Sequence, residues 1–264
     1  MNIFFRELRA NFKSLLIWSG IIILFNAVGY SKFSAFYENP DLLKVLDSMP
    51  PALLSSFNMD GFNLTTVTGF YGLMVMYFSL ILSIAAAMWG SDIISKEERD
   101  RTVEFSLSLP VTRTRLITAK LAAAAVNCLL LLGITWLVTV LQAQAYHPDA
   151  GFYDYVAISQ WAFLFLQAIF MSLGILLGCA MKSHKRAGST AVSILLGAYF
   201  TSALSGLSDG LDFLRYLTPF EYFDSLRMLR LSGIELSSVL LSGAIILVAL
   251  SAAYFAYSRR DLYI

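Results

Sequence analysis

The sequence predicts an all-α integral membrane protein with six transmembrane helices, an N-terminal interfacial helix and a re-entrant outer helical hairpin before the last span. Three observations support this fold class. The 264 residues are 58% hydrophobic and only 14% charged, and the mean hydropathy of +0.68 is too high for a soluble domain. Apolar runs reach or approach the roughly 20 residues that a helix needs to cross a bilayer. Basic residues also gather in alternate connections.

Six apolar runs are candidate spans, and the first of them is the shortest. Their approximate ranges are 14–30, 67–90, 116–142, 155–181, 188–207 and 236–257. Cys128 and Cys179 both fall inside these runs, where we expect small apolar packing residues rather than a disulfide or a metal site. The first run lacks the small-residue exit of a cleavable signal peptide.

The orientation follows from the Lys and Arg residues of the connections. With six spans, 14 of the 19 basic residues fall on one side, in the N-terminal segment, the connection 91–115 with Lys120, the connection around Lys185, and the C-terminal tail. The other side has five. The sequence therefore predicts a multi-pass protein of the plasma membrane, of the bacterial inner-membrane type, with both termini in the cytoplasm.

Residues 2–13 precede the first span and read NIFFRELRANFK. Apolar side chains including Phe4 and Phe12 can share one helical face, and charged side chains including Arg6 and Arg9 can share another. Such a helix can lie in the cytoplasmic headgroup layer. A simple charged flank of the first span is the alternative.

The polar stretch 91–115 lies between the second and third spans and carries the densest charge in the chain, with eleven Asp, Glu, Lys and Arg residues between Asp92 and Lys120. Ser95 with Glu98 three residues later forms a possible capping box for a separate helix, which Pro110 would end. Thr112 is the predicted cap of the following helix. A stretch that forms helices of its own is more than the turn needed to connect two spans, so we interpret it as a docking surface.

Two outer connections are also long. Residues 31–66 include a predicted short helix that Asn39 caps and that runs from Pro40 to Met49. Residues 208–235 are too apolar for a solvated loop, and Thr218-Pro219 divides them. Two short helices dipping into the outer leaflet fit this composition, and a helical hairpin resting on the bundle surface is the alternative.

The predicted spans contain few ionisable groups. Lys120 lies within one, near its cytoplasmic end, where its ammonium group can snorkel to the interface. Carriers driven by ion gradients normally need buried carboxylates or histidines, so this class is disfavoured. Gly174 and Gly178 have the G-x-x-x-G spacing of close helix packing, which we expect to be internal to the chain.

The run SKEERDRTVEFSLSLPVTRTR, from Ser95 to Arg115, resembles the first cytoplasmic loop of ABC-2-type permeases. In that family an acidic pair, then T-x-E, then L-P-V-[ST]-R joins spans two and three. The run YLTPFEYF from Tyr216 resembles the family's re-entrant outer segment, and SRRDL from Ser258 resembles its tails. Arg101 departs from the pattern, since the family usually has glycine before the threonine.

The resemblance covers the whole chain and implies a single ABC-2-type transmembrane domain over residues 1–264, the permease half of an ATP-binding-cassette exporter. The chain has no G-x-x-x-x-G-K-[ST] motif, so ATP and Mg are expected on a separate ATPase subunit, and no cofactor or metal on this chain. The other expected partners are a second permease chain, identical or different, and membrane lipid. No nucleic acid is expected.

By the same resemblance, three groups of residues have expected roles. The residues of the coupling region 91–115 that contact the ATPase are Glu97, Glu98, Arg101, Thr102 and Glu104. Those of the interfacial helix that braces this region are Phe4, Arg6, Arg9 and Phe12. Thr218 and Pro219 form the re-entrant break.

Two other function classes are considered. A stand-alone membrane scaffold or immunity-type protein would have no ATPase partner. An intramembrane protease would use Glu97 and Glu98 with histidines beside them, but the predicted topology places His147 and His184 on opposite sides of the membrane. The sequence therefore predicts a chain that is not itself an enzyme.

Overall fold

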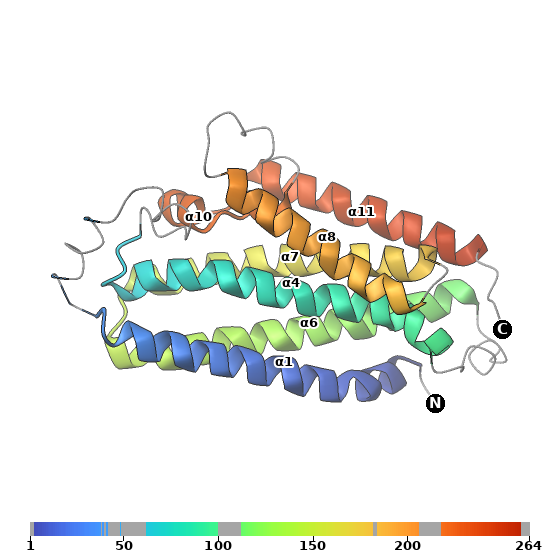
Figure 1. The fold of residues 1–264 in the computed structure, drawn as a ribbon, viewed down its shortest axis with the longest axis horizontal. Coiled ribbons are helices and arrows are strands. Elements are labelled where there is room, and N and C mark those ends of the chain that lie inside the picture. Colours follow the sequence, from blue (N-terminus) through green and yellow to red (C-terminus); the bar gives the residue numbers. More distant parts are fainter. Residues whose placement is uncertain are drawn as a thin grey trace.

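The structure is a computed structural model that describes residues 3–37, 62–99, 112–181, 184–205 and 218–259, together with residues 39, 41 and 48. Within these ranges every regular element is helical (Figure 1). The elements in chain order are α1 (Ile3–Phe33), α4 (Val67–Arg99), α6 (Arg113–Ala143), the 3-10 turn η1 (Gln144–Tyr146), α7 (Ala150–Ala180), α8 (His184–Ser205), α9 (Pro219–Tyr222), α10 (Ser225–Leu231) and α11 (Leu236–Arg259).

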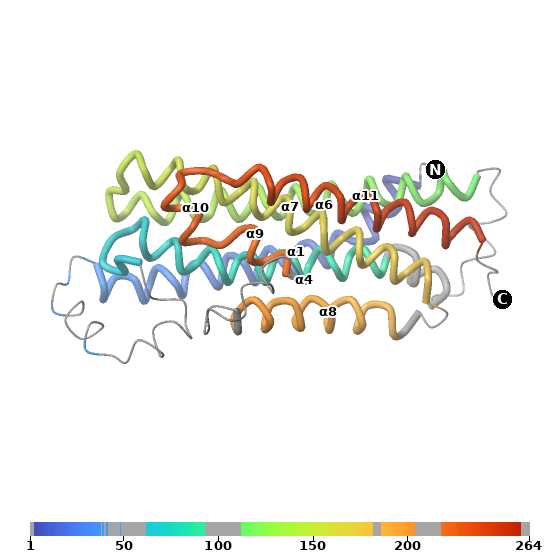
Figure 2. The backbone as a smooth tube through the Cα atoms, turned by 90° about the horizontal axis from the view of Figure 1, so that it is seen from above, coloured from blue at the N-terminus to red at the C-terminus, as the bar shows by residue number. Residues whose placement is uncertain are grey.

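The six long helices lie side by side along the length of the molecule in two rows of three (Figures 1 and 2). Helices α1, α4 and α8 form one row, and α6, α7 and α11 form the other. Helices α4 and α7 occupy the middle and are the most closely packed pair. The most apolar stretches of α4 and α7 are mainly buried, whereas those of α1 and α11 are mainly exposed. The core therefore lies around α4 and α7.

Five of the described helices are long and apolar enough to cross a membrane: Ile3–Phe33, Val67–Asp92, Arg113–Tyr146, Ala150–Ala180 and Leu236–Arg259. The sixth predicted span, 188–207, corresponds to α8, which lies beside α4 with its axis along the bundle. Helix α8 contains many Ser, Thr and Gly residues, which lower its hydropathy, so α8 is not among the five. The chain is a multi-pass membrane protein.

Helix α1 begins at Ile3 and continues without a break to Phe33, so the described part of the predicted interfacial helix 2–13 is continuous with the first span. No proline occurs in this range and the first glycine is Gly20, so nothing in the local sequence ends the helix. One face is buried at every third or fourth residue, and it includes polar Glu7, Asn11, Ser19 and Asn26. Glu7 thus lies on the buried face of α1, although it stands between the charged residues Arg6 and Arg9 in the sequence.

Helix α4 also continues beyond its predicted end, and it remains helical through Arg99. Ser95 therefore lies inside α4 and does not cap a new helix, because no glycine or proline follows Gly90 until Pro110. The Thr112 prediction is confirmed: α6 begins at Arg113, and Thr112 Oγ1 accepts a hydrogen bond from the Arg115 amide at 3.3 Å.

Small residues allow α4 and α7 to approach closely. A Cβ atom added at Gly174 would lie 2.5 Å from the Ala87 carbonyl oxygen, and one at Gly90 would clash with the Met171 carbonyl. The predicted internal packing role of Gly174 is therefore confirmed. Cys128 and Cys179 are both buried inside the bundle, as expected of small packing residues.

The start of α1 and the end of α11 lie at the same end of the bundle (Figure 1). We call it the basic end, because α1, α6, α8 and α11 bring their basic residues there, at Arg6, Arg9, Arg113, Arg186 and Arg259. The opposite end carries Asp149, Asp154 and Glu235. This asymmetry agrees with the charge distribution read from the sequence.

Most of the predicted helix from Pro40 to Met49 lies outside the described residues, although the Asn39 side chain accepts a hydrogen bond from the Asp41 amide at 3.2 Å.

Candidate functional site

The last turns of α4 carry the first two predicted coupling residues, Glu97 and Glu98, beyond the apolar span that ends at Asp92. Arg101, Thr102 and Glu104 lie outside the described residues. The first residues of the predicted coupling region therefore belong to α4, the helix at the centre of the bundle. His147 follows η1 at the opposite end, so it cannot meet these glutamates in the arrangement that a protease would need.

The predicted interfacial residues lie on the first three turns of α1. Phe4 and Arg6 are half-buried, and Arg9 and Phe12 are exposed. The residue that sequence reasoning missed is Glu7, which lies between them and is buried. Its signal was the four-residue spacing from Glu7 to Asn11 to Leu15, which continues the buried face of α1.

Glu7 forms an ion pair with Lys120 of α6. The Lys120 Nζ atom lies 3.6 Å from Glu7 Oε1, and their side chains are 0% and 6% exposed. The same Glu7 oxygen lies 3.7 Å from Arg6. Lys120 therefore does not snorkel to the interface as predicted, because a carboxylate on the neighbouring helix balances its charge inside the protein.

Further polar contacts hold the helices around α1 in register. Asn26 Nδ2 donates to Thr139 Oγ1 of α6 at 3.0 Å, and both side chains are buried. Near the basic end, Trp89 Nε1 of α4 donates to Ser14 Oγ at 2.9 Å. Contacts at both ends of α1 therefore fix its position against α4 and α6.

At the predicted re-entrant break, Thr218 and Pro219 are both buried. Pro219 is the first residue of α9, a position at which its missing amide hydrogen costs nothing. The Phe220 ring stacks on Phe170 of α7 at 5.2 Å, twenty residues along that helix from its start. Helix α9 therefore begins deep between the long helices, and in Figure 2 it lies beside the middle of the bundle.

From α9 the chain rises along α7 toward the acidic residues of the opposite end. Phe223 stacks on Phe165 at 5.7 Å. At the start of α10, Ser225 Oγ donates to the Gly72 carbonyl of α4 at 2.5 Å and meets the Tyr155 hydroxyl of α7 at 2.6 Å. Asp224 caps α10 by accepting from the Arg227 amide at 2.7 Å. These bonds attach α10 to the two central helices.

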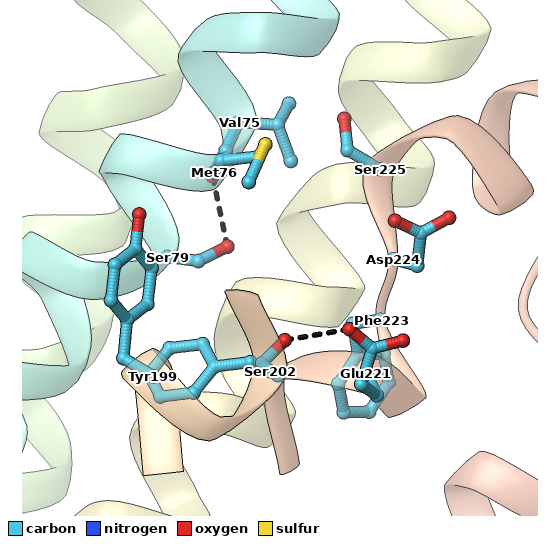
Figure 3. A pocket seen from close by; sticks show the side chains of 10 residues that line it. Val75, Met76, Ser79, Tyr199, Ser202, Glu221, Phe223, Asp224 and Ser225 are labelled. Carbon is cyan, nitrogen blue, oxygen red and sulfur yellow. Dashed lines mark hydrogen bonds between the residues drawn. The ribbon is translucent and has the colours of Figure 1, made fainter. Parts of the chain in front are cut away.

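A small pocket lies where α4, α8, α9 and the start of α10 meet (Figure 3). Its volume is about 40 Å³, enough for a few water molecules. Ser202 Oγ of α8 donates to Glu221 Oε1 at 2.7 Å, and Arg227 lies 4.0 Å from the other carboxylate oxygen. The other polar residues that line the pocket are Ser79, Tyr199, Asp224 and Ser225.

Glu221 is the chemically distinctive group of this pocket. The spans contain few charged residues, yet α9 brings a carboxylate among them, where its side chain is 16% exposed. A charged group at such depth is costly, and it usually marks a functional position. The sequence signal was an acidic residue inside an aromatic segment, FEYFD, that is too apolar for a loop.

A second and larger pocket of about 510 Å³ opens at the end opposite the basic end, between α4, α7 and α10. Asp149 and Asp154 line it together with Thr68, whose hydroxyl lies 3.4 Å from Asp149. Asp149 also caps α7 by accepting from the Phe152 amide at 2.9 Å. In the described part of the chain, no three His, Cys, Asp or Glu side chains are grouped as metal ligands would be.

Comparison with known proteins gives a match over almost the whole length. A family model described as "ABC-2 family transporter protein" matches residues 1–262. No curated protein matches the chain. The matched range contains α1 to α11, the predicted coupling region and the segment that carries Glu221.

Proposed function

The chain belongs to the ABC-2 family of transporter proteins, and from this premise we propose that it is the permease subunit of an ATP-driven exporter. Two permease chains form the translocation path, and separate ATPase subunits bind ATP and Mg. Members of this family are membrane transport components without catalytic activity of their own, and they generally pair with an ABC ATPase.

The extended α4 helix is the observation that carries the proposal. It begins at the end opposite the basic end, passes through the most buried part of the bundle and continues past Asp92 to Arg99. A protein bound at Glu97 and Glu98 would therefore act directly on the central helix. The connection between α4 and α6 provides the predicted docking surface, and the Glu7–Lys120 pair ties α6 to α1 beside it.

The exposed apolar surface of α1 supports the dimer. Large side chains at Leu16, Ile17 and Leu24 are each more than half exposed, and Gly20 among them has no neighbouring atom within 4 Å of an added Cβ. In a membrane, lipid or a second permease covers such a surface. We place the basic end in the cytoplasm of a bacterial-type cell, following the distribution of Lys and Arg.

We further propose that the segment from Thr218 to Leu231 is a re-entrant hairpin arm within the outer leaflet. The stacking of Phe220 on Phe170 and the bonds of Ser225 to Gly72 and Tyr155 support an arm that starts at depth and rises outward. Protein groups then supply the hydrogen-bond partners that the non-helical backbone of such an arm needs at membrane depth.

Charge reversal in the coupling region tests the proposed function. In the double variant Glu97→Lys, Glu98→Lys, electrostatic repulsion replaces attraction at the proposed contact with the ATPase subunit. The variant chain should still insert stably into the membrane, but it should no longer bind the ATPase or no longer support transport. The matched control reverses two exposed acidic residues at the other end, Asp41→Lys and Glu235→Lys, and it should keep both. Retention of the ATPase and of transport by the first variant would remove the docking role. A wild-type chain that never retains an ATPase would instead favour the stand-alone scaffold.

A further inference from the structure

Three uncharged polar side chains occupy the middle of the bundle with unfilled hydrogen-bonding capacity. They are Ser83 of α4, Asn127 of α6 and Gln167 of α7, which are 0%, 1% and 1% exposed. Within the described residues, Ser83 Oγ, Asn127 Nδ2 and Gln167 Oε1 have no hydrogen-bond partner. None of the three belongs to the pockets or the ion pair described above.

The three side chains lie at one level of the bundle. Gln167 Nε2 donates to the carbonyl oxygen of Cys128 at 3.4 Å, which places Gln167 beside the turn of α6 that carries Asn127. Helices α4 and α7 run in the same direction, with Phe78 against Phe163 and Ala87 against Gly174. Ser83 lies between these two contacts, and it is therefore level with the turn of α7 that carries Gln167.

Unpaired polar groups are expensive at this place. An unsatisfied donor or acceptor in an apolar interior costs about 1–3 kcal/mol, and inside a bilayer there is no bulk solvent to satisfy it. Buried polar atoms of folded proteins are almost always paired, and where the protein supplies no partner, ordered water does. Three such atoms at one level therefore point to a shared ligand.

We propose that Ser83, Asn127 and Gln167 form an internal water-binding site at the meeting point of α4, α6 and α7. The chemistry of the three atoms matches water: the Asn127 amide donates, the Gln167 carbonyl oxygen accepts, and the Ser83 hydroxyl does either. A bare cation would need oxygen ligands throughout, and the Asn127 amide donor opposes it. The site thus binds a small neutral molecule that both donates and accepts hydrogen bonds.

A double-mutant cycle on the full-length chain in lipid nanodiscs tests the shared ligand. Asn127→Leu and Gln167→Met keep the side-chain volume and remove the hydrogen bonds, and each should lower Tm by about 3 °C. Because both contact the same water, the double variant should lose clearly less than the sum of the two single losses. Additive losses would overturn the proposal.

The control cycle combines Asn127→Leu with Thr135→Val. Thr135 is also fully buried on α6, but its hydroxyl already donates to the Leu131 carbonyl at 2.8 Å. It shares no ligand with Asn127, so these two losses should add. Coupling as large as that of the first cycle would show a general effect of α6 and overturn the shared site.

An experimental density map of the wild-type chain distinguishes water from a direct contact, even if a variant fails to fold. We expect a density peak at about 3 Å from both Asn127 Nδ2 and Gln167 Oε1. A direct Asn127–Gln167 hydrogen bond with no such peak would overturn the proposal. So would a peak that Rb⁺ replaces when the sample is soaked in it, because that result identifies an alkali cation.

Discussion

Glu7 and Lys120 face each other between α1 and α6, where neither side chain reaches bulk solvent. A pair of this kind contributes little net stability over an apolar pair of the same size, because both charges lose their hydration. Loss of one member is different, since the other charge is then left alone in the interior. The pair therefore acts mainly to fix how α1 sits on α6.

Lys120→Met should lower the free energy of unfolding by about 3–5 kcal/mol, because Glu7 remains buried without its cation. Adding Glu7→Gln to the same chain should restore part of this loss, since the uncompensated charge is removed. Thermal unfolding of the single and double variants in detergent measures both effects. If the second substitution lowered stability further, the pairing would be wrong.

The sequence contains conflicting signals about Glu7, because the four-residue spacing to Asn11 and Leu15 favours its burial. Its neighbours Arg6 and Arg9 suggest a solvated face, and its partner lies 113 positions later in the chain. Lys120 was identified as a basic residue within a span, but a long side chain near a helix end can either snorkel or pair. Only the three-dimensional contact between α1 and α6 decides between these outcomes.

At the scale of the helices, Gly174 allows the close packing of α4 and α7. Gly174→Ala should destabilise the chain by about 1–3 kcal/mol, because the new Cβ meets the rigid backbone of α4 at Ala87. Gly133→Ala is the matched control on α6, where nothing lies within 4 Å of an added Cβ. It should be neutral or stabilising by up to about 1 kcal/mol, since alanine favours helix. Equal melting temperatures for the two variants would contradict the contact.

The attachment of α10 rests on the Tyr155 hydroxyl, which bonds both the side chain and the backbone carbonyl of Ser225. Tyr155→Phe should increase hydrogen exchange of the Ser225–Leu231 amides severalfold, because a hydrogen bond of about 1 kcal/mol is lost. Tyr153→Phe is the control, since Tyr153 is 42% exposed. Unchanged exchange in the Tyr155 variant would contradict this anchoring role.

Helix boundaries differ in how well local sequence predicts them. The start of α6 was correct because Thr112 has a capping hydroxyl directly before the helix. The predicted start at Ser95 was wrong, because α4 passes through it, and α1 likewise continues through residue 13 without a break. Capping residues inside a helix with no glycine or proline are not sufficient to end it.

For the whole molecule, the predicted topology has a direct test. In a chain with Cys128 and Cys179 replaced by alanine, Arg186→Cys should react with a membrane-impermeant thiol reagent only from the cytoplasm. Lys32→Cys should react only from outside. Both positions are exposed and lie at opposite ends of the bundle. Labelling of both from one side would overturn the assigned orientation.

The overall class could be read from composition, since apolar runs of sufficient length recur along the chain. The path of α9 and α10 was harder, because the aromatic residues around Thr218-Pro219 fit the predicted dipping hairpin but left a surface hairpin as an alternative. The partners of Phe220 and Ser225 are Phe170, Gly72 and Tyr155, which lie 50 or more positions away. Such pairings depend on the packing of the long helices, and no local pattern encodes them.

The absence of a joint in α1 has a mechanical consequence. Its 31 residues form a rod of about 45 Å, so its first turns cannot move independently of its outer turns. If the pair at Glu7 shifts with α6, the helix acts as a lever, and a tilt of about 5° about the basic end would carry Phe33 sideways by about 4 Å. A small displacement of α1 at one face of the membrane would thus become a displacement several times larger at the opposite face.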